Sequence, residues 1–306
     1  MAEALDQVAP NRPEKAIPKA RDGRQSLAVA WILALLIAAA IVFGIFATGD
    51  QGGRYKIVGI SFAFAAIVAA LRSATPGGTL CGALACFCIT WWTRDLESPL
   101  IHSALPPLMI LFALTFAATR AGRKQKQRRN LAERSGGRTS AQVMANLGAA
   151  ALIVTPVGAY ASALAGLTLP IDPVLLSAAC VAALAEATAD TVSSEIGQAF
   201  SERTYMLTSL HRVHRGTDGG ISILGTSAGA VAALLVVLVG AWSLRLPPGM
   251  AALAFAAGLI GLFADSLLGA TVERRGWIGN DVVNLTSTII SALTLLVLAK
   301  ATSTLH

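Results

Sequence analysis

Three carboxylates lie in one apolar, helix-length stretch of the chain, residues 173–200. Placing a carboxylate in hydrocarbon costs several kcal/mol, so Glu186, Asp190 and Glu195 need a reason to be there. In an ideal helix Glu186 and Asp190 share a face, whereas Glu195 points nearly the opposite way. We therefore expect either a distorted helix near Glu195 or a position for Glu195 at the mouth of a site.

A fourth carboxylate, Asp265, lies on a glycine-marked face of residues 249–270. Glycines let a neighbouring helix or a ligand approach closely. Converging carboxylates bind divalent cations, commonly Mg²⁺ when a phosphate completes the coordination shell. The alternative is a set of buried carboxylates that pair with Arg or accept hydrogen bonds from Ser and Thr. The predicted catalytic residues are Asp190, Glu195 and Asp265, and the predicted metal ligands are these three with Glu186.

A glycine-rich turn, RGTDGG at residues 215–220, directly precedes another apolar stretch. Free backbone N–H groups at a helix start can cradle a phosphate. The alternative is an ordinary turn in which Thr217 or Asp218 caps the helix. Gly225 and Gly229, in the following helix, have the spacing of helix-packing residues. The predicted phosphate-binding residues of the turn are Arg215, Gly216, Thr217, Gly219 and Gly220.

A basic loop carries eight Lys and Arg residues between positions 120 and 138. We expect most of them to contact anionic lipid. Those nearest the membrane are predicted to reach nucleotide or substrate phosphates. Three asparagines near the same helix ends are predicted to line the site. These further binding residues are Arg120, Lys124, Arg138, Asn146, Asn280 and Asn284.

The elements that position these residues are predicted to be transmembrane helices. Of 306 residues, 55% are hydrophobic and only 13% are charged, which is typical of a polytopic membrane protein. We predict an all-α bundle of about nine membrane-spanning helices, preceded by a disordered cytosolic tail at residues 1–26, with residues 27–306 as a single transmembrane domain. The predicted spans are 27–47, 57–74, 77–92, 100–119, 142–164, 173–200, 221–243, 249–270 and 281–300.

The distribution of positive charge predicts the orientation of these helices. With the N-terminus in the cytosol, 19 Lys and Arg residues lie on the cytosolic side and 5 on the other. This bias predicts N-in, C-out topology and a cytosolic active face, in the plasma membrane if the protein is bacterial. It also accounts for much of the net charge of +7, and no basic-aromatic module indicates nucleic acid as a partner. The four cysteines lie in apolar spans without metal-site spacing, which favours a structural role.

Several motifs occur in a fixed order over residues 60–300. They are FALTFAATRAGRKQKQ, AEATADTVSSEIG, RGTDGGISILGTSAG, ADSLLGATVE and NDVVNLTST. In this order they resemble the transmembrane protein 19 family, also called domain of unknown function 92. The resemblance assigns the family's acidic motif to Asp190 and Glu195, and its D-S-L-L-G-A-T motif to residues 265–271. This chain has Asp218 where Asn is common, and Glu273 where Gln is frequent.

The resemblance implies a prenyl-phosphate kinase, because the family's characterised plant member is a phytyl-phosphate kinase. It implies transfer of a phosphoryl group from CTP, or another nucleoside triphosphate, with Mg²⁺ to a prenyl monophosphate. The lipid tail is then expected between the helices at 173–200, 221–243 and 249–270, with the bilayer as the surrounding partner. The alternative is a cation- or proton-coupled transporter that uses the intramembrane carboxylates.

Overall fold

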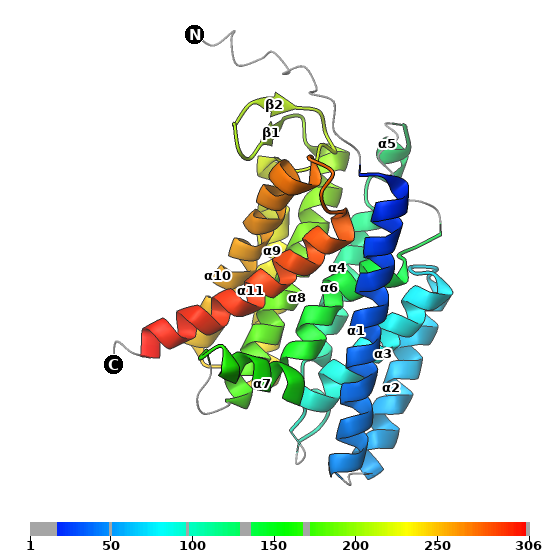
Figure 1. Cartoon of the computed structure of the whole chain (residues 1–306), viewed down its shortest axis with the longest axis vertical. Helices are drawn as coiled ribbons and strands as arrows, with labels where there is room; N and C mark the ends of the chain where they lie inside the picture. The colour runs from blue at the N-terminus through cyan, green and yellow to red at the C-terminus, as the bar shows by residue number, and fades with distance from the viewer. Residues whose placement is uncertain (1–16, 49–50, 96–97, 129–135, 168–171, 304–306) are drawn as a thin grey trace.

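The computed structural model describes residues 17–48, 51–95, 98–128, 136–167 and 172–303. Within these ranges the chain is a bundle of helices with one small antiparallel sheet at one end (Figure 1). This architecture confirms the predicted fold class, an all-α polytopic membrane protein.

The helices and strands follow one another in a simple order. The first half holds α1 (Lys19–Thr48), α2 (Gln51–Ala70), α3 (Pro76–Thr93), α4 (Leu105–Arg120), α5 (Arg123–Arg128), α6 (Ser140–Ile153) and α7 (Pro156–Leu164). The second half holds α8 (Pro173–Phe200), β1 (Thr204–Met206), β2 (Arg212–Val213), β3 (Gly220–Ile221), α9 (Ile223–Leu244), α10 (Pro248–Leu268), the π-helix η2 (Gly269–Glu273) and α11 (Asn280–Ser303).

Local capping explains where several of these helices begin. Thr139 and Gln142 form a reciprocal capping box at the start of α6. Asp172 caps α8 ahead of Pro173, whose fixed φ suits the first helical position. Ser222 caps α9 by accepting a hydrogen bond from the Gly225 N–H at 3.1 Å. The alternative in which Thr217 or Asp218 caps this helix is therefore wrong.

Each of the nine predicted spans contains a helix, but these helices differ in length. Among the described residues, six helices are long and apolar enough to cross a membrane, and a seventh crossing results if the bent pair α6–α7 counts as one. The pair bends by 73° because Thr155 and Pro156 start a new helix inside the predicted span 142–164. The number of nine crossings and the N-in, C-out orientation stay predictions.

The first helix begins earlier than the predicted boundary at residue 27. It starts at Lys19, so residues 19–26 of the predicted tail are helical, while residues 1–16 lie outside the described residues. Gln25 explains the extension, because its side chain donates to Trp277 O at 3.1 Å and accepts from Gly279 N at 2.9 Å. Tertiary contacts with the segment that precedes α11 thus stabilise a segment whose polarity alone favours disorder.

Helix α8 is the centre of the bundle. Of its most apolar 18-residue segment, 78% is buried inside the protein, against 22–44% for the other candidate membrane-spanning helices. Helix α8 packs against α4, α6, α9, α10 and α11. Small residues permit this packing: a Cβ added at Gly229 would lie 2.6 Å from Ala189 O, and one at Gly225 would lie 2.5 Å from Ser193 O. The prediction that these two glycines pack helices is confirmed.

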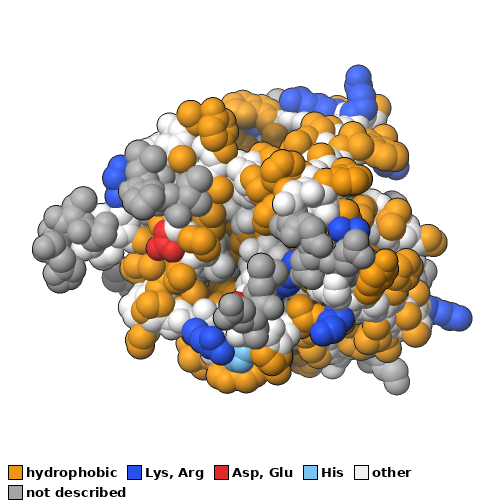
Figure 2. All heavy atoms as spheres, turned by 90° about the horizontal axis from the view of Figure 1, so that it is seen from below, with side chains coloured by type: hydrophobic (Ala, Val, Ile, Leu, Met, Phe, Trp, Pro, Cys, Tyr) orange, Lys and Arg blue, Asp and Glu red, His pale blue; other side chains and the backbone are white. Residues whose placement is uncertain are grey.

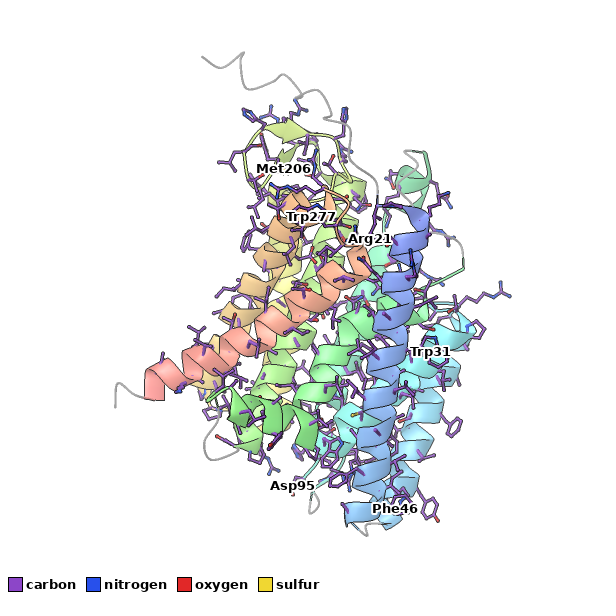
Figure 3. The ribbon with its side chains drawn as sticks, viewed as in Figure 1. Arg21, Trp31, Phe46, Asp95, Met206 and Trp277 are labelled. Atoms are coloured by element: carbon purple, nitrogen blue, oxygen red, sulfur yellow. The ribbon has the colours of Figure 1, made fainter. Side chains whose placement is uncertain are left out.

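The outer surface of the bundle is apolar, as a bilayer requires. Trp31 is 64% exposed and Phe46 is 84% exposed on α1, and Figure 3 shows both away from the bundle centre. Seen from below, hydrophobic side chains cover much of the face, with Lys and Arg side chains scattered among them (Figure 2). Large apolar side chains exposed over several helices are expected where lipid, not water, surrounds the protein.

The opposite end, at the top of Figure 1, gathers the polar elements. Helix α5, the strands β1 and β2, and the first turn of α11 all lie there (Figure 1). The sheet order is β2-β1-β3, with both pairs antiparallel. An isolated parallel bridge between Ala74 and Arg138 ties the α2–α3 connection to the start of α6. The predicted chemical motifs therefore converge on one end of the molecule.

Candidate functional site

A polar cavity of about 460 Å³ lies at the C-terminal end of α8. Its walls come from α6, α8, the turn that precedes α9, α10 with η2, and α11. It collects residues that are far apart in sequence, from Arg138 to Asn284. A concave site with convergent polar groups is the usual form of a ligand site, so we take this cavity as the candidate functional site.

Two of the predicted carboxylates, Asp190 and Asp265, face each other in this cavity. Their carboxyl groups interact electrostatically, one from α8 and one from α10, and both line the cavity. Ser287 Oγ on α11 donates to Asp265 Oδ2 at 3.3 Å and fixes that side chain. Two adjacent carboxylates repel each other when ionised, so they favour a cation between them or near them.

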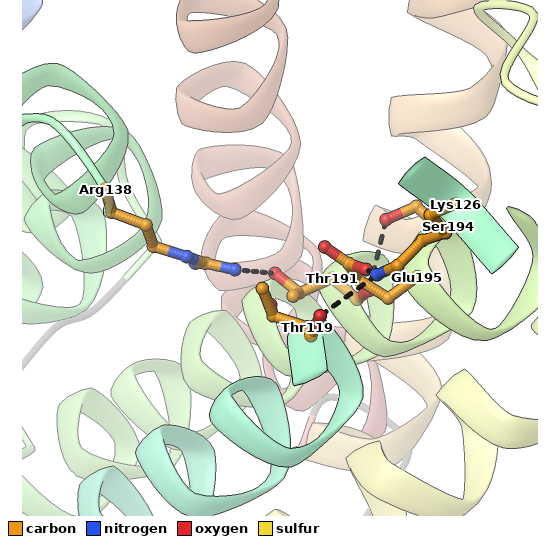
Figure 4. A network of polar contacts seen from close by, with 6 residues as sticks. All are labelled: Thr119, Lys126, Arg138, Thr191, Ser194 and Glu195. Carbon is orange, nitrogen blue, oxygen red and sulfur yellow. Dashed lines mark hydrogen bonds and ion pairs between the residues drawn. The ribbon is translucent and has the colours of Figure 1, made fainter. Parts of the chain in front are cut away.

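The nearby cation that the structure provides is Arg138, at the start of α6. Its backbone N–H donates to Ser73 O at 2.9 Å, which holds it beside the α2–α3 connection. Its Nη2 donates to Thr191 Oγ1 at 3.3 Å (Figure 4). Its charge also acts on Asp190. The preceding Gly137 has φ +76°, and a Cβ there would meet the Ala74 backbone at 2.8 Å. Only glycine at position 137 therefore allows the chain to pass so close to the Ala74 backbone.

Glu195 has a partner of its own, Lys126 of α5. The two side chains form an ion pair, and Lys126 Nζ also donates to Thr119 O at 3.1 Å (Figure 4). Both residues are buried, with 7% of Glu195 and 2% of Lys126 exposed. Gly122 makes this possible, because a Cβ there would lie 2.5 Å from the Ala199 Cβ on α8. Glu195 therefore fits the alternative prediction, in which a buried carboxylate pairs with a cation. The partner is Lys126 and not an arginine.

Glu186 lies deeper in the bundle and does not line the cavity. It is only 1% exposed, and neither carboxylate oxygen accepts a hydrogen bond from any residue in the described part of the chain. Gly261 of α10 packs directly on it, since an added Cβ would lie 2.5 Å from Glu186 Cγ. Helix geometry therefore places Glu186 one turn below Asp190, on the side of α8 that faces α10.

The four predicted metal ligands do not form a preformed metal site. Within the described ranges, no three His, Cys, Asp or Glu side chains are arranged to hold a metal ion. Mg²⁺ is usually bound by one or two carboxylates, with water and substrate phosphates as its other ligands. The pair Asp190 and Asp265 fits that requirement, whereas Glu195 is engaged by Lys126.

The glycine turn packs against η2 and forms one wall of the cavity. Gly216 and Gly219 have φ +78° and +72°, and a Cβ at Gly219 would collide with the Ala270 backbone. Two amides are used inside the turn, since Thr217 N–H donates to His214 O and Gly220 N–H donates to Thr217 O. Residues 216–220 all line the cavity, but Arg215 is not part of its lining.

The predicted asparagines and basic residues divide between two places. Asn146, Asn280 and Asn284 line the polar cavity, and Asn284 Oδ1 is buried without a hydrogen-bond partner among the described residues. Arg120 instead lines a second cavity, where it donates to Leu71 O at 2.9 Å and lies over the Phe116 ring. The Lys124 side chain lies outside what the structure describes.

Sequence reasoning missed Glu273 as a site residue. It lines the cavity from η2, within reach of Asn280 and in the field of Asp218. The available signal was its position eight residues after Asp265, which puts both on one side of a continuous helix. Burial of the four free cysteines agrees with the structural role predicted for them.

The fold and this site define a polytopic helical membrane protein with a carboxylate-lined cavity at one end. The family described as integral membrane protein DUF92 matches residues 59–292, and the chain belongs to this family. This agrees with the family resemblance found in its motifs.

Three relatives illustrate the range of the family. The chain is 40% identical over 113 residues to an uncharacterised membrane protein of Methanocaldococcus jannaschii, which covers 37% of this chain and 47% of that protein. It is 31% identical over 176 residues to Protein VTE6, a chloroplastic protein of Arabidopsis thaliana, covering 56% and 51%. It is 30% identical over 190 residues to an uncharacterised membrane protein of Synechocystis, covering 60% and 69%. The chain thus spans about half the length of the first two relatives, and no solved structure matches it.

Proposed function

We propose that this protein is a membrane-embedded kinase that transfers a phosphoryl group from a nucleotide to a prenyl monophosphate. The observation that carries the proposal is the cavity in which Asp190 and Asp265 face each other beside Arg138 and the glycine turn. Carboxylates for a metal, a cation for phosphate and a glycine turn are the groups that phosphoryl transfer needs. The family resemblance supports the prenyl-phosphate substrate and CTP as the donor.

Asp190 and Asp265 are the residues that would hold Mg²⁺ in this proposal. When bound, the ion would neutralise charge on the nucleotide phosphates. The two carboxylates come from different helices, so their separation is set by the packing of α8 against α10. Gly258 and Gly261 permit that packing, because Cβ atoms there would lie 3.2 Å from the Ala185 Cβ and 2.5 Å from Glu186 Cγ.

The rest of the site would position the two phosphates and balance their charge. An oxygen of the prenyl phosphate forms a bond to the terminal phosphorus of the nucleotide. The bond from that phosphorus to its bridging oxygen breaks, which gives prenyl diphosphate and a nucleoside diphosphate. Arg138 would pair with phosphate oxygens, and Gly216, Gly219 and Gly220 would let the backbone of the turn approach the nucleotide closely. Such catalysis depends on alignment in the cavity more than on covalent chemistry by the protein.

A substrate panel tests this proposal. The purified protein in lipid nanodiscs would receive Mg²⁺, CTP, ATP, GTP or UTP, and phytyl, geranylgeranyl, farnesyl or undecaprenyl monophosphate. We expect prenyl diphosphate with at least one donor–acceptor pair, and loss of that product in Asp190→Asn. Folded protein that forms no diphosphate with any pair would contradict the proposal.

A second candidate function, cation- or proton-coupled transport, rests on Glu186. A buried carboxyl group without a hydrogen-bond partner among the described residues, one turn below Asp190, is a typical feature of a proton or cation path. This hypothesis predicts that Glu186→Gln abolishes ion flux in proteoliposomes. The kinase proposal instead predicts no flux, and a kinase rate in Glu186→Gln within about tenfold of wild type, since Glu186 does not line the cavity.

A further inference from the structure

A second cavity, of about 160 Å³, lies between α2, α3, α4 and α6. Part of its wall is apolar and is formed by Phe64, Val68, Leu108, Leu111 and Phe112, with Gly82 leaving space on the α3 side. Of the predicted site residues, Arg120, Arg138 and Asn146 line this cavity, whereas the predicted carboxylates do not.

The other end of the same cavity is strongly basic. It is lined by Arg72, Arg120, Arg123, Lys126 and Arg138, and no Asp or Glu is among the described residues that line it. Lys126 pairs with Glu195, so the remaining positive charge comes from four arginines. An apolar interior with a cationic end is complementary to a hydrocarbon chain that carries a phosphate.

Arg138 and Asn146 connect this cavity to the polar one. Both residues line both cavities. The Arg138 guanidinium donates to Thr191 Oγ1, next to Asp190, while its backbone is fixed against Ser73 by a 2.9 Å hydrogen bond. A phosphate bound by Arg138 from the apolar side would therefore face the carboxylates of the polar cavity.

We propose that the apolar cavity binds the isoprenoid chain of the lipid phosphate, with the phosphate at its basic end. The inference rests on the proposed function and moves the tail from the predicted position between α8, α9 and α10 to the space between α2, α3, α4 and α6. Lipid and nucleotide then reach the junction at Arg138 from different cavities. This arrangement keeps the hydrocarbon away from the polar walls that would bind the nucleotide.

Photo-crosslinking tests the placement without any need for turnover. Farnesyl monophosphate with a diazirine in its hydrocarbon chain would be bound to the wild-type protein in nanodiscs, irradiated, and mapped by mass spectrometry. We expect labelled peptides from α2, α3 and α4, near Phe64, Val68 and Leu108. Unlabelled farnesyl monophosphate should compete, while farnesol and phosphatidylglycerol at the same concentration should not.

Three outcomes would overturn the inference. They are labelling confined to α8, α9 and α10, equal competition by farnesol, and equal competition by phosphatidylglycerol, which would make the cavity a site for ordinary bilayer lipid. The crosslinking measures binding and not catalysis. Labelling of α2, α3 and α4 without kinase activity would therefore contradict the proposed function but still support this binding site. Kinase activity with labelling between α8 and α10 would support the proposed function but contradict this binding site.

A blocking variant supplies a second test. A Cβ at Gly82 would meet Phe64 at an ordinary 3.4 Å, so a larger side chain there enters the cavity. We expect Gly82→Leu to reduce crosslinking at least tenfold. The matched control is Gly59→Leu on α2, where an added Cβ meets nothing within 4 Å, and it should label like wild type. Equal labelling of the two folded variants would contradict the site; if Gly82→Leu does not fold, the wild-type labelling pattern alone decides.

Discussion

Asp190 and Glu195 lie five residues apart on α8, yet their surroundings give them different roles. Asp190 faces Asp265 across the cavity and interacts electrostatically with Arg138, whereas Glu195 forms an ion pair with the buried ammonium group of Lys126. A carboxylate already paired with Lys is a poor metal ligand, while two facing carboxylates favour a cation. At the residue scale we therefore propose that Asp190 and Asp265 would bind the metal ion, and that Glu195 has a positioning role.

The proposed role of Asp265 in metal binding predicts that a nearly isosteric substitution lowers the kinase rate strongly. Asp265→Asn keeps the shape of the side chain but removes the charge, so we expect the prenyl-phosphate kinase rate to fall at least about 100-fold. The measurement is kcat/KM for the nucleotide in nanodiscs. The control is Asp172→Asn, since Asn also caps helices and this residue lies at the opposite end of α8. A rate in Asp265→Asn near that of the control would contradict the assignment.

The Lys126–Glu195 pair gives a prediction about stability. Lys126→Met leaves a buried, unpaired carboxylate, so we expect the free energy of unfolding to fall by about 3–5 kcal/mol. Adding Glu195→Gln removes that charge and should recover most of the loss. The comparison is made by unfolding the single and double variants in an SDS titration.

The activity of the double variant separates the two roles considered for Glu195. If it acts only by positioning α5 and α8, the stable double variant keeps measurable kinase activity. Complete loss of activity with recovered stability would return Glu195 to the catalytic set.

Side-chain pairing shows where prediction from sequence stops. Helical periodicity predicted that Glu195 points away from Glu186 and Asp190. The structure pairs Glu195 with Lys126 of α5, but Glu195 also lines the polar cavity together with Asp190. The identity of its partner depends on the left-handed turn at Gly122, φ +63°, which sends α5 back over the end of α8. That turn is a tertiary feature, and eight cations in the basic loop gave no means of choosing Lys126.

At the element scale, helix positions followed from hydrophobic length, and helix ends followed from local chemistry. Apolar stretches located α8, α9, α10 and α11 closely. Two features were not predicted, the break between α6 and α7 and the π-helix η2. The hydrophobicity of a segment does not depend on whether its backbone is a continuous α-helix. Thr155–Pro156 was the available signal for the first of these, since Pro following Thr is a common helix start.

The contact between the glycine turn and η2 gives a test at this scale. Gly219→Ala forces a side chain into a φ of +72° and against the Ala270 backbone, so we expect a loss of about 1–3 kcal/mol in stability. Gly59→Ala, in open space on α2, should be neutral or slightly stabilising. Thermal unfolding in detergent compares them, and equal transition temperatures would contradict the packing of this wall.

At the scale of the whole molecule, the gathering of the polar elements at one end was the most successful inference from sequence. Counting Lys and Arg predicted that the basic loop, the glycine turn and the start of α11 share a side, and the structure places them together (Figure 1). The second cavity was not predictable, because its apolar walls come from helices whose sequences differ little from ordinary membrane spans.

The predicted orientation can be measured by labelling. Ser209→Cys and Asp95→Cys place one exposed thiol near each end of the molecule, while the four native cysteines are buried. A membrane-impermeant maleimide should label Asp95→Cys in intact cells and Ser209→Cys only after permeabilisation. The reverse pattern would put the site outside the cytosol and contradict access by a cytosolic nucleotide.

Phosphoryl transfer to the lipid can be measured by following the transferred phosphate itself. CTP or ATP labelled with ³²P at the terminal phosphate would be incubated with farnesyl monophosphate, Mg²⁺ and the protein in nanodiscs, and the lipid products would be separated. We expect label in farnesyl diphosphate, dependent on Mg²⁺, present in Asp172→Asn and absent in Asp190→Asn. Label that never enters the lipid, or enters it equally in Asp190→Asn, would contradict the proposed kinase function.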